Sequence, residues 1–162
     1  MGSIEQELRN YLTTFAKSFT DYAAEELTKT AREAIQYFYD DYTKPPRKYV
    51  RTDNLRNNSY EKYKKNNGNY FYGGVRISAD CPTHPMKPYP HGKGHTTDPT
   101  LVFNAAWGEG KHGFQQAPPK ITIPTPYEIV KRKRDSEDFQ KEVFNHAIQE
   151  AKKGQYKILQ CQ

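Results

Sequence analysis

The sequence predicts an α+β fold in which a long N-terminal helix and a C-terminal helix pack on a small antiparallel sheet, with a long proline-rich loop. Three observations support this prediction. Apolar residues recur at helical spacing over 4–42, an aromatic and β-branched run covers 70–78, and most of the eleven prolines lie within 81–126. The length of 162 residues suits one domain, which we expect to span 1–162.

The first predicted element is a helix over 4–42. Its apolar positions step by three or four residues and form a single stripe. Ser3 and Gln6 have the spacing of a capping box, and the prolines at 45 and 46 prevent the helix from continuing. Such a helix would be almost 60 Å long, more than a compact domain of this size spans. We therefore expect it either to break or to project into a neighbour.

A basic arm and a small sheet are predicted over 47–78. The arm, 47–60, is rich in arginine and in turn-forming Asn and Asp, and we expect it to contain a short helical turn. A turn at 66–69 then precedes a strand at 70–78, whose Gly-Gly pair predicts a β-bulge. A second strand between 58 and 64 would complete a hairpin.

The predicted loop covers 81–126, where frequent prolines exclude continuous helix. The only strongly apolar piece within it is 100–107, which suits either a strand or one helical turn. A loop of this length in a compact domain indicates a functional role or docking on another surface.

The last secure element is a helix over 136–153, which starts at Ser136 and stops at Gly154. The basic run 131–134 before it reads as a solvated loop, although a targeting or nucleic-acid patch has the same composition. Residues 156–159 suit either a final edge strand or a frayed tail.

Composition favours a binding protein. Hydrophobic residues make up only 35% of the chain against 27% charged residues, which suggests surfaces that become buried in a partner. Thirteen tyrosines fit half-buried contacts, because the ring is apolar while the hydroxyl stays hydrated. A formal charge of +6 favours acidic partners, either a nucleic acid or an acidic protein face.

A metal site is the most enzyme-like feature of the sequence. The candidate ligands, four within fifteen residues, are Cys81, His84, His91 and His95. Structural zinc usually recruits two or more thiolates, whereas only one is present here, so the favoured interpretation is a polar proline-rich loop. We therefore assign no metal and no cofactor.

Other chemical signals are weaker. The glycine-rich segment 108–113 lacks the spacing of a phosphate-binding loop, and no well-placed acid and base pair points to catalysis. Two cysteines are too few for a disulfide framework and indicate a reducing compartment. No window approaches about 18 consecutive apolar residues, so we expect a soluble protein without a membrane partner.

The basic hairpin suggests a nucleic-acid interface. Lysines alternate with tyrosines over 60–65, and 70–72 adds further aromatic residues, a combination that can stack bases and neutralise phosphates. A half-exposed hairpin produces the same alternation. Both interpretations stay open.

Three segments together resemble a known family: the long N-terminal helix, the arm Tyr49–Asn58, and Trp107–Gly113, which reads WGEGKHG. With these segments the chain is similar to the head-tail joining and tail-completion proteins of tailed bacteriophages, over roughly residues 4–151. Asp53 stands where that family commonly has glycine, and the proline-rich loop here is longer than usual.

The resemblance implies a virion component without a catalytic centre, made in the host bacterial cytoplasm. It would form a ring, with six copies expected, in the neck between connector and tail. Its partners would be other neck, connector and tail proteins, with DNA possible in the channel. The residues that we expect at interfaces with neighbours are Arg47, Arg51, Leu55, Arg56, Trp107, His112 and Phe114.

Three functional hypotheses follow. The leading one is a structural protein of the phage neck that joins the connector to the tail and is not an enzyme. The second is a basic nucleic-acid-binding module that uses the hairpin. The third is a zinc-dependent or zinc-stabilised domain.

Overall fold

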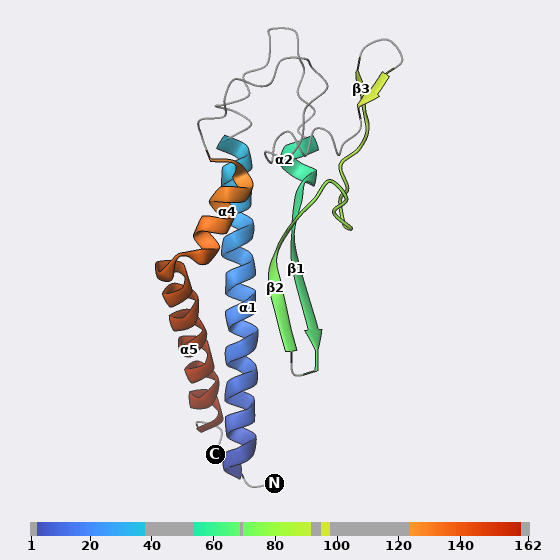
Figure 1. The fold of residues 1–162 in the computed structure, drawn as a ribbon. Coiled ribbons are helices and arrows are strands. Elements are labelled where there is room, and N and C mark those ends of the chain that lie inside the picture. Colours follow the sequence, from blue (N-terminus) through green and yellow to red (C-terminus); the bar gives the residue numbers. More distant parts are fainter. Residues whose placement is uncertain (1–2, 38–53, 69, 92–94, 98–123, 160–162) are drawn as a thin grey trace.

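The computed structural model describes residues 3–37, 54–68, 70–91, 95–97 and 124–159. Figure 1 shows one long central helix, with a second long helix on one side and a β-hairpin on the other. This arrangement confirms the predicted α+β class. In chain order the elements are α1 (Ser3–Tyr37), α2 (Asn54–Asn58), β1 (Tyr60–Asn67), β2 (Tyr70–Ile77), β3 (Tyr89–His91), β4 (His95–Thr97), α4 (Pro126–Asp135) and α5 (Glu137–Leu159).

The central helix α1 is about 52 Å long, from its 35 residues at about 1.5 Å each. It runs unbroken through all of its described residues, while 38–42 of the predicted helix lie outside them. Its apolar stripe has two environments. The C-terminal half is buried, whereas Ile4, Leu8 and Leu12 at the N-terminal end are exposed.

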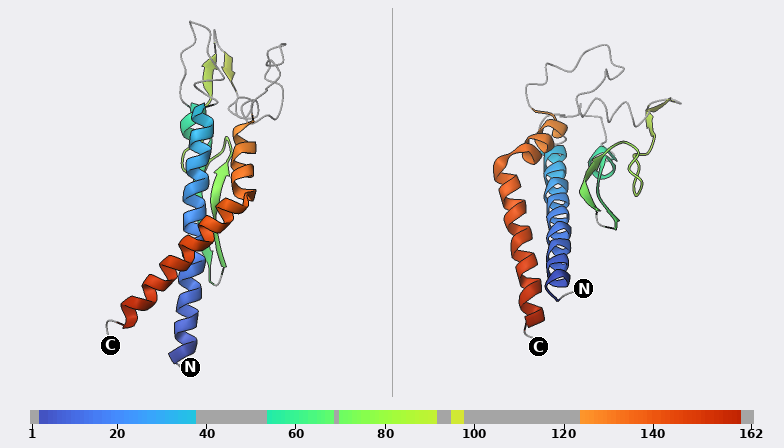
Figure 2. Two further views of the ribbon diagram at one scale, coloured as in Figure 1. Left: turned by 90° about the vertical axis from the view of Figure 1, so that its left-hand side faces the viewer. Right: turned by 60° about the horizontal axis from the view of Figure 1, so that its bottom comes forward.

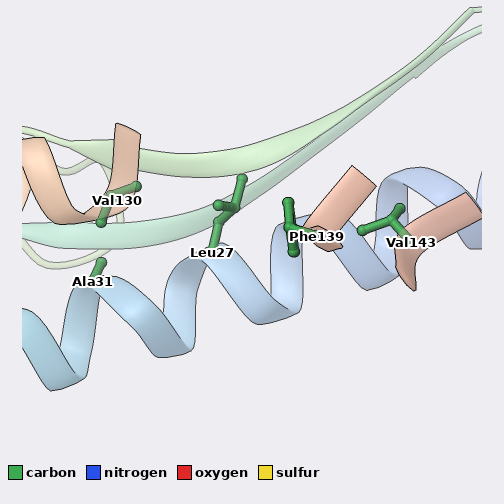
Figure 3. Packing of buried hydrophobic residues seen from close by; sticks show 5 residues of the cluster. All are labelled: Leu27, Ala31, Val130, Phe139 and Val143. Atoms are coloured by element: carbon green, nitrogen blue, oxygen red, sulfur yellow. The ribbon is translucent and has the colours of Figure 1, made fainter. Parts of the chain in front are cut away.

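The hydrophobic core lies between α1, α4 and α5, as Figure 3 shows. Burying each large aliphatic or aromatic side chain stabilises the fold by about 1.5–3 kcal/mol. Alanines such as Ala31, which is fully buried, allow the neighbouring elements to approach α1 closely. The core cluster consists of Leu27, Ala31, Val130, Phe139 and Val143, with partly buried Phe19, Tyr22, Ala23, Tyr60, Val75 and Ile77 packed against it.

The hairpin β1–β2 confirms the predicted sheet, but its first strand continues to Asn67, past the predicted limit at 64 and into the first half of the turn predicted at 66–69. Its antiparallel register runs without interruption from Tyr60 opposite Ile77 to Asn67 opposite Tyr70. The predicted glycine bulge is therefore wrong. Gly68 in the turn has a φ of 62°, a left-handed conformation that glycine adopts at little cost.

Gly73 has a different role from the one predicted. A Cβ atom at this position would lie only 2.7 Å from the backbone oxygen of Thr20 in α1. The missing side chain therefore lets the hairpin lie directly against the helix.

The region predicted as a proline-rich loop contains a second short hairpin, in which β3 pairs antiparallel with β4. This hairpin was not predicted, because its two strands have only three residues each and lie among prolines. The apolar piece at 100–107 lies outside the described residues. The short helical turn predicted in the basic arm is confirmed as α2.

The basic run 131–134 forms the end of helix α4, so its interpretation as a loop is wrong. Thr125 caps this helix: its hydroxyl accepts from the Glu128 N–H at 3.3 Å, while the Thr125 N–H donates to the Glu128 carboxylate at 2.8 Å. Pro126 occupies the first turn, where no N–H is required. Arg132, Lys133 and Arg134 lie in the last turn, where their positive charges interact favourably with the negative end of the helix dipole.

Helix α5 continues through Gly154 to Leu159, so the predicted stop at Gly154 is wrong. Residues 156–159, predicted as an edge strand or a frayed tail, belong to this helix. Glycine in a helix interior costs only about 1 kcal/mol relative to alanine. Packing outweighs that cost, since Ala147 and Ala151 of the same helix are both buried. The helix starts at Glu137, one residue after the predicted start, and Ser136 caps it by accepting from the Phe139 N–H at 3.4 Å.

Candidate interaction surfaces

The N-terminal end of α1 presents an apolar surface to solvent. Ile4, Leu8 and Leu12 have exposed fractions of 81%, 56% and 54%, and they follow one another at helical spacing on one side of the helix. Phe15 continues the stripe and packs edge-on against Phe144 of α5, with ring centroids 5.5 Å apart. We call these five residues, from Ile4 to Phe144, the apolar edge.

The apolar edge is exposed because α5 diverges from α1. Figure 2 shows α5 crossing α1 and moving away from it towards the N-terminal end of α1. Among the described elements, none of the helices therefore packs over the stripe in the first turns of α1. Phe144 lies beside this gap with half of its side chain exposed. Isolated apolar residues on a surface are ordinary, whereas a contiguous row of them is a candidate interaction surface.

Polar and aromatic contacts join α5 to the middle of α1. The Tyr22 hydroxyl donates to the Glu142 carboxylate at 2.6 Å, and the Tyr22 ring stacks on His146 with centroids 4.1 Å apart. The hydrogen bond to Glu142 is the main reason that the pKa of Tyr22 is raised to about 12. The tyrosine therefore stays neutral over the physiological range and remains a donor.

The second exposed surface is the side of the hairpin that faces away from α1. Side chains alternate between the two sides of a strand, and cross-strand partners share a side. Val75 and Ile77 pack against the core, so the neighbouring positions of the same strands point outward. Tyr70 and Tyr72 expose 65% and 51% of their surface. We call this outward surface the tyrosine face; it consists of Tyr63, Lys65, Tyr70, Tyr72 and Arg76.

Most of the basic charge of the hairpin is paired within the chain. Lys62 forms an ion pair with Glu25, and Lys64 pairs with Asp21 at 2.7 Å. Both carboxylates belong to α1, so these lysines lie on the side that faces the helix. They also account for the lowered pKa of Glu25, chiefly through the hydrogen bond from Lys62. The cations on the tyrosine face are therefore Lys65 and Arg76, whereas Lys62 and Lys64 are paired on the other side of the hairpin.

At the other end of the hairpin, a buried carboxylate ties the segment after β2 to β1. Glu61 Oε2 accepts from the Thr83 hydroxyl at 2.6 Å and from the Thr83 N–H at 3.2 Å, while Oε1 accepts from Arg76 at 3.2 Å. The hydrogen bond from the Thr83 hydroxyl is the main reason that the pKa of Glu61 is lowered, against the opposing effect of burial. The Arg76 guanidinium also lies over the Tyr63 ring, 5.7 Å from its centroid.

His84 extends this hydrogen-bond network. Its Nδ1 lies 2.6 Å from the Thr83 hydroxyl oxygen, and its Nε2 lies 3.0 Å from the backbone oxygen of Tyr60. A carbonyl only accepts, so Nε2 must carry a proton. Thr83 and Tyr60 thus hold the two ring nitrogens of His84 between the segment after β2 and the first strand.

The four candidate zinc ligands do not form a site in the described part of the chain. Both His84 nitrogens face protein hydrogen-bond partners, and Cys81 is buried, with its thiol 3.3 Å from the Ser78 oxygen. Burial raises the pKa of this thiol, which disfavours the thiolate that zinc requires. His91 and His95 are cross-strand partners in the short hairpin. No group of three or more potential ligands occurs among the described residues.

Of the seven interface residues predicted from the sequence, five lie outside the described residues: Arg47, Arg51, Trp107, His112 and Phe114. The other two lie in α2. Leu55 belongs to this short helix, and Arg56 donates to the Gln36 amide oxygen at 3.3 Å. This bond joins α2 to α1 within the chain.

The apolar edge is the surface that sequence reasoning did not single out. Its residues belong to the stripe that predicted α1, and a stripe does not reveal where its covering partner ends. The available signal was the helix length, which exceeded the span of a compact domain. Within the described residues, none of the helices combines the length and the apolar character needed to cross a membrane. Comparison with family models, curated proteins and solved structures found no match to this chain.

Proposed function

We propose that this chain is a structural assembly protein that works by joining copies of itself and neighbouring proteins, without a catalytic role. In its specific form, the proposal is a virion protein of the phage neck that forms a ring between connector and tail. The sequence resemblance to head-tail joining and tail-completion proteins supports the specific form. The described structure supports the general form.

The observation that carries the general proposal is the apolar edge. A row of large apolar side chains along about three turns of a projecting helix costs solubility unless a partner covers it. Burying apolar surface at an interface is the main source of affinity between subunits. The exposed fractions of Ile4, Leu8 and Leu12 indicate that this row is available to a partner.

The ion pairs of the hairpin make the nucleic-acid hypothesis less favourable than assembly. Affinity for phosphates grows with the number of unpaired cations that contact them. Lys62 and Lys64 are engaged by carboxylates of α1, and Arg76 is engaged by Glu61. A ring can still use the overall positive charge, either around DNA in a channel or against an acidic face of an adjoining ring.

The test is the mass of the purified chain in solution, by light scattering over a range of protein concentrations and at low and high salt. We expect oligomers that grow with concentration, and negative-stain images of closed rings. Six copies of the 18.9 kDa chain would have a mass of about 113 kDa. Assembly only on addition of connector or tail components would also support the proposal.

Two results would contradict this proposal. A monomer at every concentration that also ignores connector and tail components would remove the assembly function. A monomer that binds DNA with strong salt dependence would favour the nucleic-acid module instead. Zinc measured on the same sample tests the third hypothesis, which requires stoichiometric metal.

A further inference from the structure

The apolar edge and the tyrosine face lie on opposite sides of α1. Phe15 and Phe144 meet on the side occupied by α5, and Thr20 contacts the hairpin on the other side. Figures 1 and 2 agree that α1 stands between α5 and the hairpin. The described chain covers neither surface, and its fold prevents the two from meeting within one molecule.

We propose that the apolar edge of one subunit packs on the tyrosine face of the next, so that copies of this chain assemble head to tail. This inference rests on the proposed assembly function and names its interface. A contact between unlike surfaces leaves one of each kind free on every pair. Further copies can then add until a ring closes, whereas a contact between two like surfaces stops at a dimer.

The two surfaces suit each other chemically. Leucine and isoleucine side chains from a helix provide a flexible apolar row, and tyrosine rings from a strand provide a flat, rigid platform with hydroxyls at its rim. Interfaces combine an apolar centre with aromatic residues in this way. The tyrosine hydroxyls can remain hydrated while the rings are covered.

Charge on the two surfaces is opposite in sign. The tyrosine face carries Lys65 and Arg76 beside the buried carboxylate of Glu61, two basic groups against one acidic group, which leaves +1. The segment of α1 that bears the exposed stripe, 3–16, carries Glu5 and Glu7 against Arg9, which leaves −1. The opposite signs of these two charges favour contact between an apolar edge and a tyrosine face over contact between two apolar edges or two tyrosine faces.

The experiment uses two variants of the full chain. An edge variant carries Leu8→Gln and Leu12→Gln, which keep good helix formers on exposed positions. A face variant carries Tyr70→Thr and Tyr72→Thr, which keep residues suited to strands. Lys17→Gln, an exposed change on α1 outside the stripe, is the matched control. Circular dichroism and thermal unfolding establish that each variant is folded.

We expect each variant alone to self-associate at least about 100-fold more weakly than the original chain, since each has lost one of the two surfaces. Mixed in equal amounts, the variants should form a one-to-one dimer and nothing larger. The face variant retains an intact apolar edge, and the edge variant retains an intact tyrosine face. Only one productive contact can therefore form per pair.

Other outcomes separate the failure of this interface from the failure of assembly itself. If the original chain assembles but the mixed variants stay monomeric, the head-to-tail contact is wrong while the assembly function stands. A face variant that dimerises alone would show contact between two apolar edges and would also overturn the proposal. An original chain that never assembles would remove both proposals. If the face variant misfolds, Tyr70→Thr alone, at the exposed end of the hairpin, replaces it in the mixture.

Discussion

Glu61 and Thr83 are joined by two hydrogen bonds, from the Thr83 hydroxyl at 2.6 Å and from its backbone N–H at 3.2 Å. Thr83 lies in the segment after the hairpin, and Glu61 lies in the first strand of the hairpin. The pair therefore attaches the chain that leaves β2 to the neighbouring strand. Since Glu61 is only 7% exposed, its charge depends on these donors rather than on water.

Replacing Thr83 with valine should destabilise the protein by about 1–3 kcal/mol, because a buried carboxylate loses a charge-assisted donor while the side-chain shape is retained. Urea unfolding followed by circular dichroism measures the change. Thr83→Ser, which keeps the hydroxyl, is the control and should cost clearly less. Equal losses for both substitutions would mean that the methyl group, and not the hydroxyl, stabilises this junction.

Stability should fall in acid in a way that depends on Glu61. Its pKa in the folded protein is lowered, so the unfolded chain takes up the proton more readily. The stabilisation is fully present above the unfolded value, about pH 4.3, and is lost as the pH falls through the lower folded value.

The measurement for this prediction is the free energy of unfolding from about pH 7 to pH 3 for the original chain and for Glu61→Gln. The variant should be less stable at neutral pH, and the two curves should converge in acid. Other carboxylates with a lowered pKa titrate in both proteins and cancel in the difference. Parallel curves would show that Glu61 is not the group responsible.

Gly73→Ala should destabilise the protein by about 1–3 kcal/mol, since the new methyl group would overlap the backbone of α1 at Thr20. Gly74→Ala is the adjacent control. Its Cβ atom would lie 3.3 Å from the ring of Tyr63, an exposed side chain that can move aside. Thermal unfolding compares the two, and a larger loss at Gly74 would contradict the packing of the hairpin on α1.

Gly154→Ala should stabilise the protein by about 0.5–1 kcal/mol, because Gly154 is inside α5 and a Cβ atom there would meet nothing within 4 Å. Denaturant unfolding measures the gain. If Gly154 instead ended the helix in a left-handed conformation, alanine would be destabilising. Gly68→Ala is the reference for that behaviour, since its φ of 62° strains any L side chain.

Local patterns predicted most of the described helices and strands. The stripe of α1, the start of α5 at Ser136 and the turn at Gly68 each depend on residues that are close in sequence. The helix α4 had such a signal as well, because Thr125 and Glu128 have the spacing of a capping box. That signal went unused beside the prolines and the basic run that follows it.

The errors arose where a distant contact changes the meaning of a local pattern. Gly73 looks like a bulge until α1 is placed against it, and Gly154 looks like a stop until α5 is seen packed along α1. In the same way, the sequence does not show that Lys62 and Lys64 are paired, because Glu25 and Asp21 lie in another element. Each case requires a partner far away in the sequence.

The sequence by itself determined the two long helices, the hairpin turn, and that the first helix is longer than a compact domain spans, since these features follow from short-range periodicity and turn chemistry. Only the tertiary structure decided which part of that surface stays exposed. Leu27 is buried against residues of α4 and α5, whereas Leu8 and Leu12 are exposed, although all three belong to one stripe. Burial of the stripe depends on where α5 moves away from α1, and the sequence pattern of α1 does not reveal that position.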